Sequence, residues 1–115
     1  MQERELLIRR MLGKHVHVVI DRPIGYVHHD LVYPINYGYI PGILAGDGEE
    51  QDAYILGMDV PLTEFDGRVV GVVRRADDVE DKLVVAPEGV FFSAAEIADA
   101  VRFQEQYFSH SIAVL

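Results

Sequence analysis

Two short acidic segments carry the residues of this chain that are best suited to chemistry. Each crowds four carboxylates into five or six positions, directly before an apolar run. Like charges packed this closely repel one another unless something compensates them. Divalent cations that prefer oxygen ligands (Mg²⁺, Mn²⁺ or Ca²⁺) are the simplest compensation. The candidate metal ligands are Asp47, Glu49, Glu50 and Asp52 in the first segment and Asp77, Asp78, Glu80 and Asp81 in the second.

The same pattern also fits two solvated acidic turns that share no metal, since charge runs usually mark solvated faces. A calcium loop of the EF-hand type is a poor alternative, because that loop needs glycine at position six and glutamate at position twelve. Counted from Asp47, those positions hold Asp52 and Met58.

A zinc site built from histidines is a rival of different chemistry. His15 and His17 alternate along a predicted strand and share one face of it, and His28-His29 follows at a short distance in sequence. Histidine pairs on strands also occur without metal, so the pattern alone does not favour zinc over the acidic site.

Length and composition bound the class of protein. The chain has 115 residues, half of them hydrophobic, which predicts a single globular domain over residues 1–115. It has no cysteine, which removes disulfides and thiolate chemistry and fits a cytoplasmic protein. A net charge of -9 argues against a nucleic-acid partner. No apolar stretch approaches 18 residues and no signal-peptide pattern opens the chain, so we expect no membrane span.

Hydrophobic periodicity and chain breakers divide the sequence into elements. A capping box of Ser93 and Glu96 marks the start of the last helix. The predicted helices are Glu3–Leu12 and Ala94–Phe108. Loops are predicted at Gly25–Asp30 and at Asp59–Gly67, the latter with a turn at Asp66-Gly67. The predicted strands are His15–Asp21, Tyr33–Ile40 (closed by Pro41-Gly42), Ala53–Met58, Arg68–Arg75 and Lys82–Ala86.

The last three strands place the acidic segments relative to each other. Short connections make an antiparallel meander the default arrangement. Strand Ala53–Met58 would then begin at the end of the sheet where the turn before Lys82–Ala86 lies. Both acidic segments are therefore expected on one rim.

Three segments, in this order, resemble the soluble family I inorganic pyrophosphatases. They are YPINYGYIPG at 33–42, GDGEEQD at 46–52 and VVGVVRRADDVEDKLVVAPEG at 69–89, and the resemblance covers about Val18 to Pro87. It implies a mainly β fold: a small, closed, OB-like β-barrel with a C-terminal helix and a short N-terminal helix. It also implies Mg²⁺-dependent hydrolysis of pyrophosphate to two phosphates, with Mn²⁺ as an alternative metal. We further expect a homo-oligomer.

The resemblance assigns roles to the residues of these segments. The metal ligands that it implies are Asp47, Asp52, Asp77, Glu80 (or Asp81 in its place) and Asp21. The aspartate that helps to activate the water falls at Glu49 or Glu50, and Lys82 matches a phosphate-contacting lysine. Tyr33 and Tyr37 match active-site tyrosines, and Tyr107 matches a C-terminal one.

Several of these residues also have structural interpretations. Tyr33, Tyr37 and Tyr39 can pack a barrel wall, which we prefer for Tyr39. Lys82 can form a surface ion pair, and Tyr107 can belong to the core face of its helix. Asp21 can cap a turn.

The chain also departs from the family. A longer hairpin region, carrying a lysine, a glutamate and an arginine of the active site, is represented by only nine residues, Ile24–Val32, and the hairpin is expected to be deleted. Phe108 stands where the family has a lysine. Arg22 is the candidate substrate-binding cation in compensation, with His28, His29 and Arg75 as further replacements. A non-catalytic descendant that binds metal-phosphate or a protein partner is the alternative function.

Overall fold

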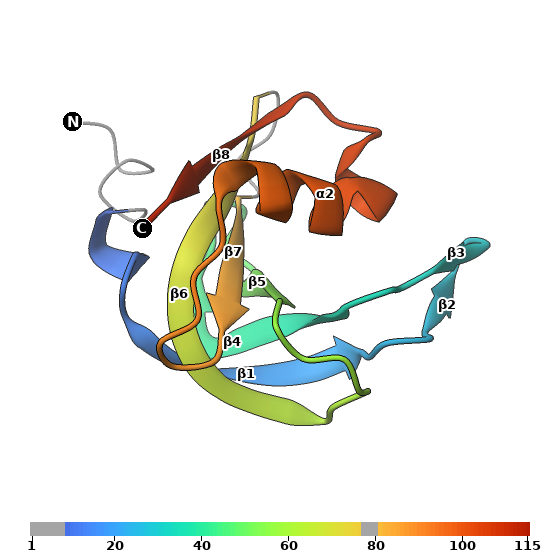
Figure 1. Cartoon of the computed structure of the whole chain (residues 1–115), viewed down its shortest axis with the longest axis horizontal. Coiled ribbons are helices and arrows are strands. Elements are labelled where there is room, and N and C mark those ends of the chain that lie inside the picture. The colour runs from blue at the N-terminus through green and yellow to red at the C-terminus, as the bar shows by residue number, and fades with distance from the viewer. Residues whose placement is uncertain (1–8, 77–80) are drawn as a thin grey trace.

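A barrel of five strands with a helix laid across its outside forms the body of the protein (Figure 1). The computed structural model describes residues 9–76 and 81–115. In chain order its elements are β1 (His15–Arg22), β2 (Val27–His28), β3 (Leu31–Val32), β4 (Asn36–Leu44), β5 (Glu50–Ile55), β6 (Glu64–Arg75), β7 (Lys82–Ala86), α2 (Ala94–Glu105) and β8 (His110–Val114). Residues 9–11 are helical; the earlier part of the predicted N-terminal helix lies outside the described residues.

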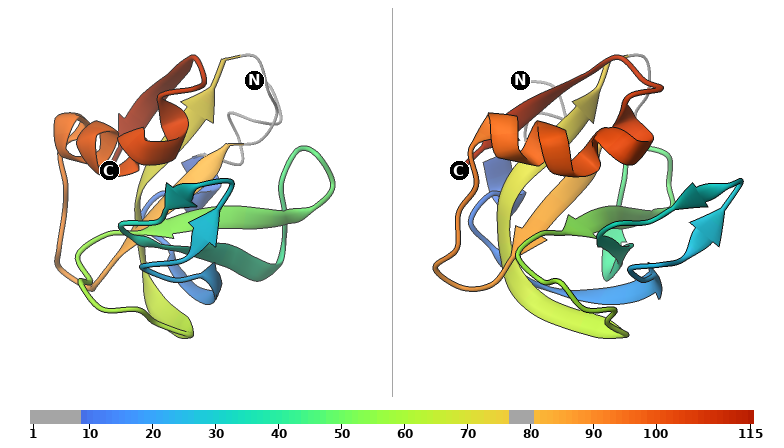
Figure 2. Two further views of the ribbon diagram at one scale, coloured as in Figure 1. Left: turned by 90° about the vertical axis from the view of Figure 1, so that its right-hand side faces the viewer. Right: turned by 45° about the vertical axis from the view of Figure 1, so that its right-hand side comes forward.

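The sheet closes because β6 is long enough to pair with two partners along one edge. The sheet order is β1-β4-β5-β7-β6-β8, and an additional β1–β6 pairing completes the barrel. The first part of β6 pairs with β1, from Val19↔Glu64 to His15↔Arg68, and its last part pairs with β8. Figure 2 shows the strong curvature that this double pairing requires. The mainly β fold with a closed barrel and a C-terminal helix is thus as the sequence predicted.

Alternation along the strands divides the apolar residues between two cores. Ala53 and Ile55 of β5 join the core inside the barrel. Tyr54 and Leu56 join a second core, together with Ile97 and Val101 of α2. The helix therefore covers the outer face of β5, β7 and β6, and the side chains of that face lie beneath it.

Helix α2 begins where its capping box predicts. The Ser93 hydroxyl accepts a hydrogen bond from the Glu96 backbone N–H (3.1 Å), and the Glu96 carboxylate accepts one from the Ser93 N–H (2.9 Å). The helix ends at Glu105, three residues before the predicted end at Phe108. The chain then turns and returns as β8, a strand that the sequence did not predict.

The predicted meander is wrong, although the two strands do start at one rim as predicted; most of the second acidic segment lies outside the described residues. Strand β5 pairs with β7 in parallel, and β6 lies on the far side of β7. The connection of residues 56–63 carries the chain to β1 before β6 runs back. Because parallel strands begin at the same end, the starts of β5 and β7 share one rim.

At three places where the sequence predicted a turn or a loop, the structure has paired strand residues. Strand β4 runs through Pro41-Gly42, with a register shift between Ile40 and Leu44 that absorbs the break. Asp66-Gly67 lies inside β6, paired with β1, and not in a turn. The predicted loop Gly25–Asp30 contains strand β2, which pairs with β3 in a short hairpin. This hairpin projects from the barrel beneath the C-terminal end of α2 (Figure 1).

Candidate active site

A pocket of about 690 Å³ opens where the hairpin, the rim of the barrel and the end of α2 meet. Three basic side chains line it, from three different strands: Arg22, Lys82 and Arg75. Among the described residues, the acidic side chains that line it are Asp30 and Asp52.

Lys82 and Asp52 meet on the floor of the pocket. The register Ala53↔Leu83 of β5 and β7 places the two residues side by side. The Lys82 ammonium donates a hydrogen bond to Asp52 Oδ2 at 2.6 Å, and Lys82 is only 3% exposed. An ammonium this buried needs a counter-charge. The expected surface ion pair is therefore a pair built into the pocket.

Tyr37 of β4 also lines the pocket. It pairs with Tyr54 of β5, two residues along that strand from Asp52. Lys82 Nζ stands 5.8 Å from its ring centre, and the guanidinium carbon of Arg22 stands 5.7 Å from it. Burial raises the pKa of the Tyr37 hydroxyl, and the charge and hydrogen bond of Asp52 raise it further. Tyr37 is thus a neutral hydroxyl that can donate a hydrogen bond.

A chain of hydrogen bonds behind the pocket wall starts at Arg22. Its guanidinium donates to the Tyr33 hydroxyl (2.6 Å), which donates to Gln104 Oε1 (2.6 Å). The Gln104 amide in turn donates to the Tyr54 hydroxyl (2.7 Å). Tyr33 is 1% exposed and does not line the pocket. Its observed contacts are those of a residue that positions Arg22.

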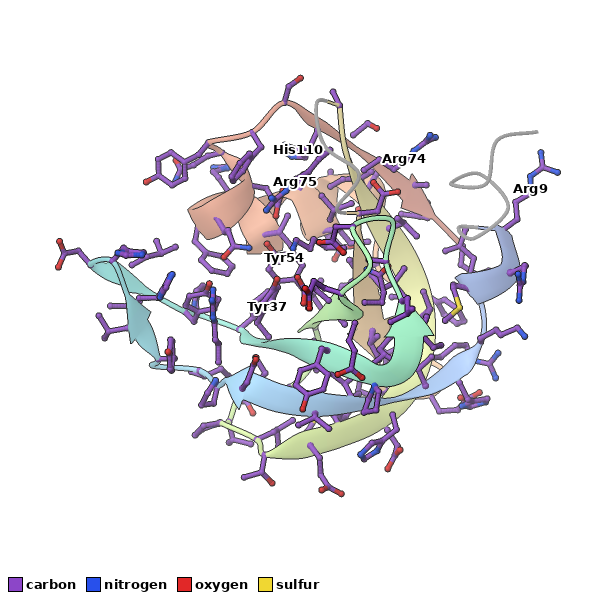
Figure 3. All side chains as sticks on the ribbon, turned by 180° about the vertical axis from the view of Figure 1, so that it is seen from behind. Arg9, Tyr37, Tyr54, Arg74, Arg75 and His110 are labelled. Atoms are coloured by element: carbon purple, nitrogen blue, oxygen red, sulfur yellow. The ribbon has the colours of Figure 1, made fainter. Side chains whose placement is uncertain are left out.

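The chain ends at the second arginine. The Tyr54 hydroxyl donates to Glu105 Oε2 (2.6 Å), and Arg75 donates two hydrogen bonds to the same carboxylate, each 3.0 Å long. Burial alone would raise the pKa of Glu105, but the hydrogen bonds from Arg75 and Tyr54 outweigh it and hold the pKa below its usual range. Figure 3 shows Tyr37, Tyr54 and Arg75 on the side of the barrel that α2 covers.

Arg75 also contacts the residue that stands where the family has a lysine. Its guanidinium carbon lies 3.8 Å from the centre of the Phe108 ring, within the range of a cation–π contact. The buried carboxylate of Glu105 and this ring together hold a cation at the pocket wall.

Asp52 is the one carboxylate of the first acidic segment that lines the pocket. Asp47, Glu49 and Glu50 are exposed in and after the turn between β4 and β5. Asp47 Oδ1 accepts a hydrogen bond from the Glu49 backbone (3.0 Å), and Glu50 Oε2 accepts one from the Gly42 backbone (3.1 Å). Counted against Asp-Gly-Asp-Pro-x-Asp, the motif of the resemblance, Glu49 stands at the middle aspartate and Glu50 at the proline.

The second acidic segment is described only at its end. Asp81 is buried beside Lys82, and its backbone carbonyl accepts a hydrogen bond from the buried Gln51 amide at 2.5 Å. Asp77 and Glu80 lie outside the described residues. Within residues 9–76 and 81–115, no three histidine, aspartate or glutamate side chains are grouped to hold a metal ion.

The carboxylates of Asp21 and Asp52 interact electrostatically at the rim of the barrel. Partial desolvation of its carboxyl raises the pKa of Asp21, and the charge of Asp52 adds to that increase, against the opposing effects of a backbone hydrogen bond and of Arg22. These two carboxylates, on β1 and β5, are both among the metal ligands that the resemblance implies.

Tyr107 lines the pocket and is 71% exposed, so the alternative that it belongs to the core face of its helix is wrong. It follows the end of α2 and has left the apolar face of the helix. Tyr39 is partly buried on β4.

The sequence did not identify Tyr54, Gln104 or Glu105. The last of these had a detectable signal, because Glu105 continues the apolar series Ile97 and Val101 at helical spacing. A glutamate in such a stripe indicates a buried partner.

Comparisons with known proteins agree on one family. A family model described as "Inorganic pyrophosphatase" matches residues 11–110. The chain is 33% identical over 94 residues to an inorganic pyrophosphatase of Xanthomonas campestris pv. campestris, covering 70% of this chain and 51% of that protein. It is 35% identical over 72 residues to one of Saccharolobus solfataricus, covering 60% and 40%. The chain thus spans about half the length of the curated relatives that it matches.

Solved structures agree with the fold. The crystal structure of an inorganic pyrophosphatase from Ehrlichia chaffeensis superposes with a TM-score of 0.71 at 20% identity, covering 90% of this chain and 87% of that one. One from Thermus thermophilus gives 0.58 at 19% identity, covering 88% and 80%. At these identities the likeness establishes the barrel architecture. Among the described residues, no helix has the length and apolar character needed to cross a membrane.

Proposed function

Because the chain belongs to the inorganic pyrophosphatase family, we propose that it hydrolyses inorganic pyrophosphate to two phosphates in a Mg²⁺-dependent reaction, with Mn²⁺ able to replace Mg²⁺. The observation that carries the proposal is the pocket in which Arg22, Lys82 and Arg75 converge beside Tyr37 and Asp52. Pyrophosphate is a multiply charged anion, and phosphoryl transfer needs cations and hydrogen-bond donors placed around it.

The proposed metal ligands are Asp47, Asp52, Asp77, Glu80 and Asp21, with Asp81 in the place of Glu80 as the alternative. Bound Mg²⁺ would neutralise phosphate oxygens and lower the pKa of a coordinated water. The described carboxylates do not by themselves complete a metal site. The metal dependence in the proposal therefore depends on the family relationship and on Asp77 and Glu80.

Within the pocket, each described side chain has a task in this proposal. Lys82 and Arg22 bind the oxygens of the two phosphoryl groups, and Tyr37 donates a hydrogen bond to one of them. The oxygen of water forms a new bond to one phosphorus, and the bridging oxygen leaves with the electron pair of the broken bond and gains a proton. Glu49, or Glu50 as the second candidate, accepts the proton of the water. This role is taken from the resemblance, because both side chains are exposed at the β4–β5 turn, outside the pocket lining. Tyr107, at the open side, contacts the substrate.

Loss of the family's hairpin lysine and arginine predicts hydrolysis that is weak or altered unless other cations replace them. The candidate replacements Arg22, His28, His29 and Arg75 all line the pocket together with Lys82. This convergence supports the proposal of an active enzyme with a rebuilt set of cations.

The test is release of phosphate from pyrophosphate by the purified chain, with Mg²⁺, with Mn²⁺ and with a chelator. We expect metal-dependent release from pyrophosphate and none from p-nitrophenyl phosphate, a monoester of phosphate. Metal binding without any release would contradict the proposal and favour a non-catalytic descendant. The proposed homo-oligomer is tested by light scattering on the same sample.

A further inference from the structure

Two of the five histidines differ from the others in their surroundings. His15 and His17 contact carboxylates on the barrel surface, and His110 hydrogen-bonds a backbone carbonyl. Within the part of the chain that the structure describes, no hydrogen bond engages the imidazole of His28 or His29. Both of these side chains line the pocket.

A tight two-residue turn presents these two histidines. The register of β2 and β3 pairs His28 with Leu31, so His29 and Asp30 alone form the turn of the hairpin. Both have positive φ, 49° and 64°. A two-residue turn with positive φ at both positions most often takes Asn-Gly or Asp-Gly. Aspartate and histidine are among the other residues that adopt this conformation, so the turn forms here without a glycine.

The surroundings of the histidine pair suit an anion better than a metal ion. The two rings lie 4.1 Å apart between centroids, and His28 stacks on Tyr26 at 6.5 Å. The positive charge of Arg22 acts on His28, as does His29. A cation entering here meets a guanidinium, whereas an oxyanion meets N–H donors from three side chains. Asp30, the carboxylate of the same turn, is exposed at the pocket edge.

We propose that His28 and His29, together with Arg22, form a subsite for one phosphoryl group of the substrate. The inference rests on the proposed function, in that the ligand is a phosphate ester or anhydride of that reaction. It assigns to the short hairpin a direct role in holding the substrate. Arg22 is fixed from behind by Tyr33, its charge acts on His28, and its side chain lines the same pocket as the two imidazoles.

The test is a titration of the full-length chain with inorganic phosphate, without metal, followed by NMR of the histidine rings. Sodium chloride at equal ionic strength is the reference. We expect the signals of His28 and His29 to move with saturation and those of His15 and His17 to stay in place. Equal responses to phosphate and chloride would overturn the subsite. Zn²⁺ moving both signals while phosphate moves neither would overturn it as well and assign a metal.

The matched variant is His29→Gly. Glycine suits the positive φ of this position, so the variant should melt at the same temperature as the parent or higher. Its phosphate affinity should fall about tenfold, the loss of one charge-assisted hydrogen bond. His17→Ala, on the barrel surface, should keep the parent affinity. Full affinity in His29→Gly would overturn the proposal.

The outcomes separate this inference from the proposed function, because the titration involves no hydrolysis. Phosphate bound at the hairpin by a chain that releases no phosphate from pyrophosphate would contradict the proposed function and support the subsite. Hydrolysis of pyrophosphate by a chain whose His28 and His29 signals do not move with phosphate would support the proposed function and contradict the subsite.

Discussion

Replacing Glu105 by glutamine should destabilise the protein more than most other single changes. Its carboxylate is 0% exposed and accepts two hydrogen bonds from Arg75 (3.0 Å each) and one from Tyr54 (2.6 Å). An amide removes one acceptor and the negative charge, while Arg75 stays buried at 5% exposure. Breaking a buried pair on one side costs about 3–5 kcal/mol in the free energy of unfolding. At about 4 °C per kcal/mol for a chain of this size, Tm should fall by about 12–20 °C.

The loss should also depend on pH with a definite sign. The pKa of Glu105 is held below its usual range in the folded protein, where the hydrogen bonds of Arg75 and Tyr54 outweigh burial. Its charged form therefore contributes fully above the unfolded-state pKa of about 4.3, and the contribution is lost as pH falls through the lower folded-state pKa. Urea unfolding followed by circular dichroism at pH 7, 5 and 3.5 measures this. The difference between parent and Glu105→Gln should be equal at pH 7 and 5 and smaller at pH 3.5.

Helix α2 offers a matched control in the exposed pair of Asp99 and Arg102 (3.0 Å). Its side chains are 74% and 66% exposed, so Asp99→Asn should change the free energy of unfolding by less than about 0.5 kcal/mol. A Glu105→Gln variant whose free energy of unfolding lies within about 1 kcal/mol of the parent's would refute the reasoning, because a broken buried pair costs more than that. A loss that grows as pH falls would refute it too.

Three further changes test other parts of the structure. Ser93→Ala removes the N-cap hydroxyl of α2 and should cost about 1 kcal/mol in urea unfolding; an unchanged midpoint would mean that the capping box contributes nothing. Gly38→Ala would drive a Cβ into the Val19 carbonyl oxygen where β1 and β4 pair, so we expect little folded protein by circular dichroism, and a normal spectrum would contradict the close approach. Asp52→Asn should abolish pyrophosphate hydrolysis while Asp59→Asn, in the connection after β5, should keep it; equal rates would show that the pocket is not the reaction site.

Local signals in the sequence predicted the elements that local interactions determine. The capping residues Ser93 and Glu96 fixed the start of α2, and the apolar run Lys82–Ala86 became β7 with the predicted bounds. Where pairing partners decide, the local signal misled. Asp66-Gly67 has a good turn sequence, but pairing with β1 holds it in β6.

The parallel pairing of β5 and β7 could not be predicted from short-range order, because it depends on how the barrel closes. The shared rim of the two strands was nevertheless correct, since both arrangements start the two strands at the same end of the sheet, but only the parallel pairing brings Asp52 next to Lys82. The hydrogen-bond network that ends at Arg75 and Glu105 was harder to predict from the sequence. Arg75 and Glu105 stand 30 positions apart, and nothing in their neighbourhoods pairs them. Only the placement of a glutamate on the buried face of a helix indicated a partner.

The central claim is that the cations of this pocket act on pyrophosphate, and Lys82 tests it most directly. The measurement is kcat/KM for Mg²⁺-dependent pyrophosphate hydrolysis by the parent, by Lys82→Ala and by the control Arg102→Ala, an exposed cation on α2. The account predicts a loss of about 10²–10³ in Lys82→Ala, as for one well-placed charge donor, and an unchanged value in the control. A folded Lys82→Ala variant as active as its parent would contradict the account.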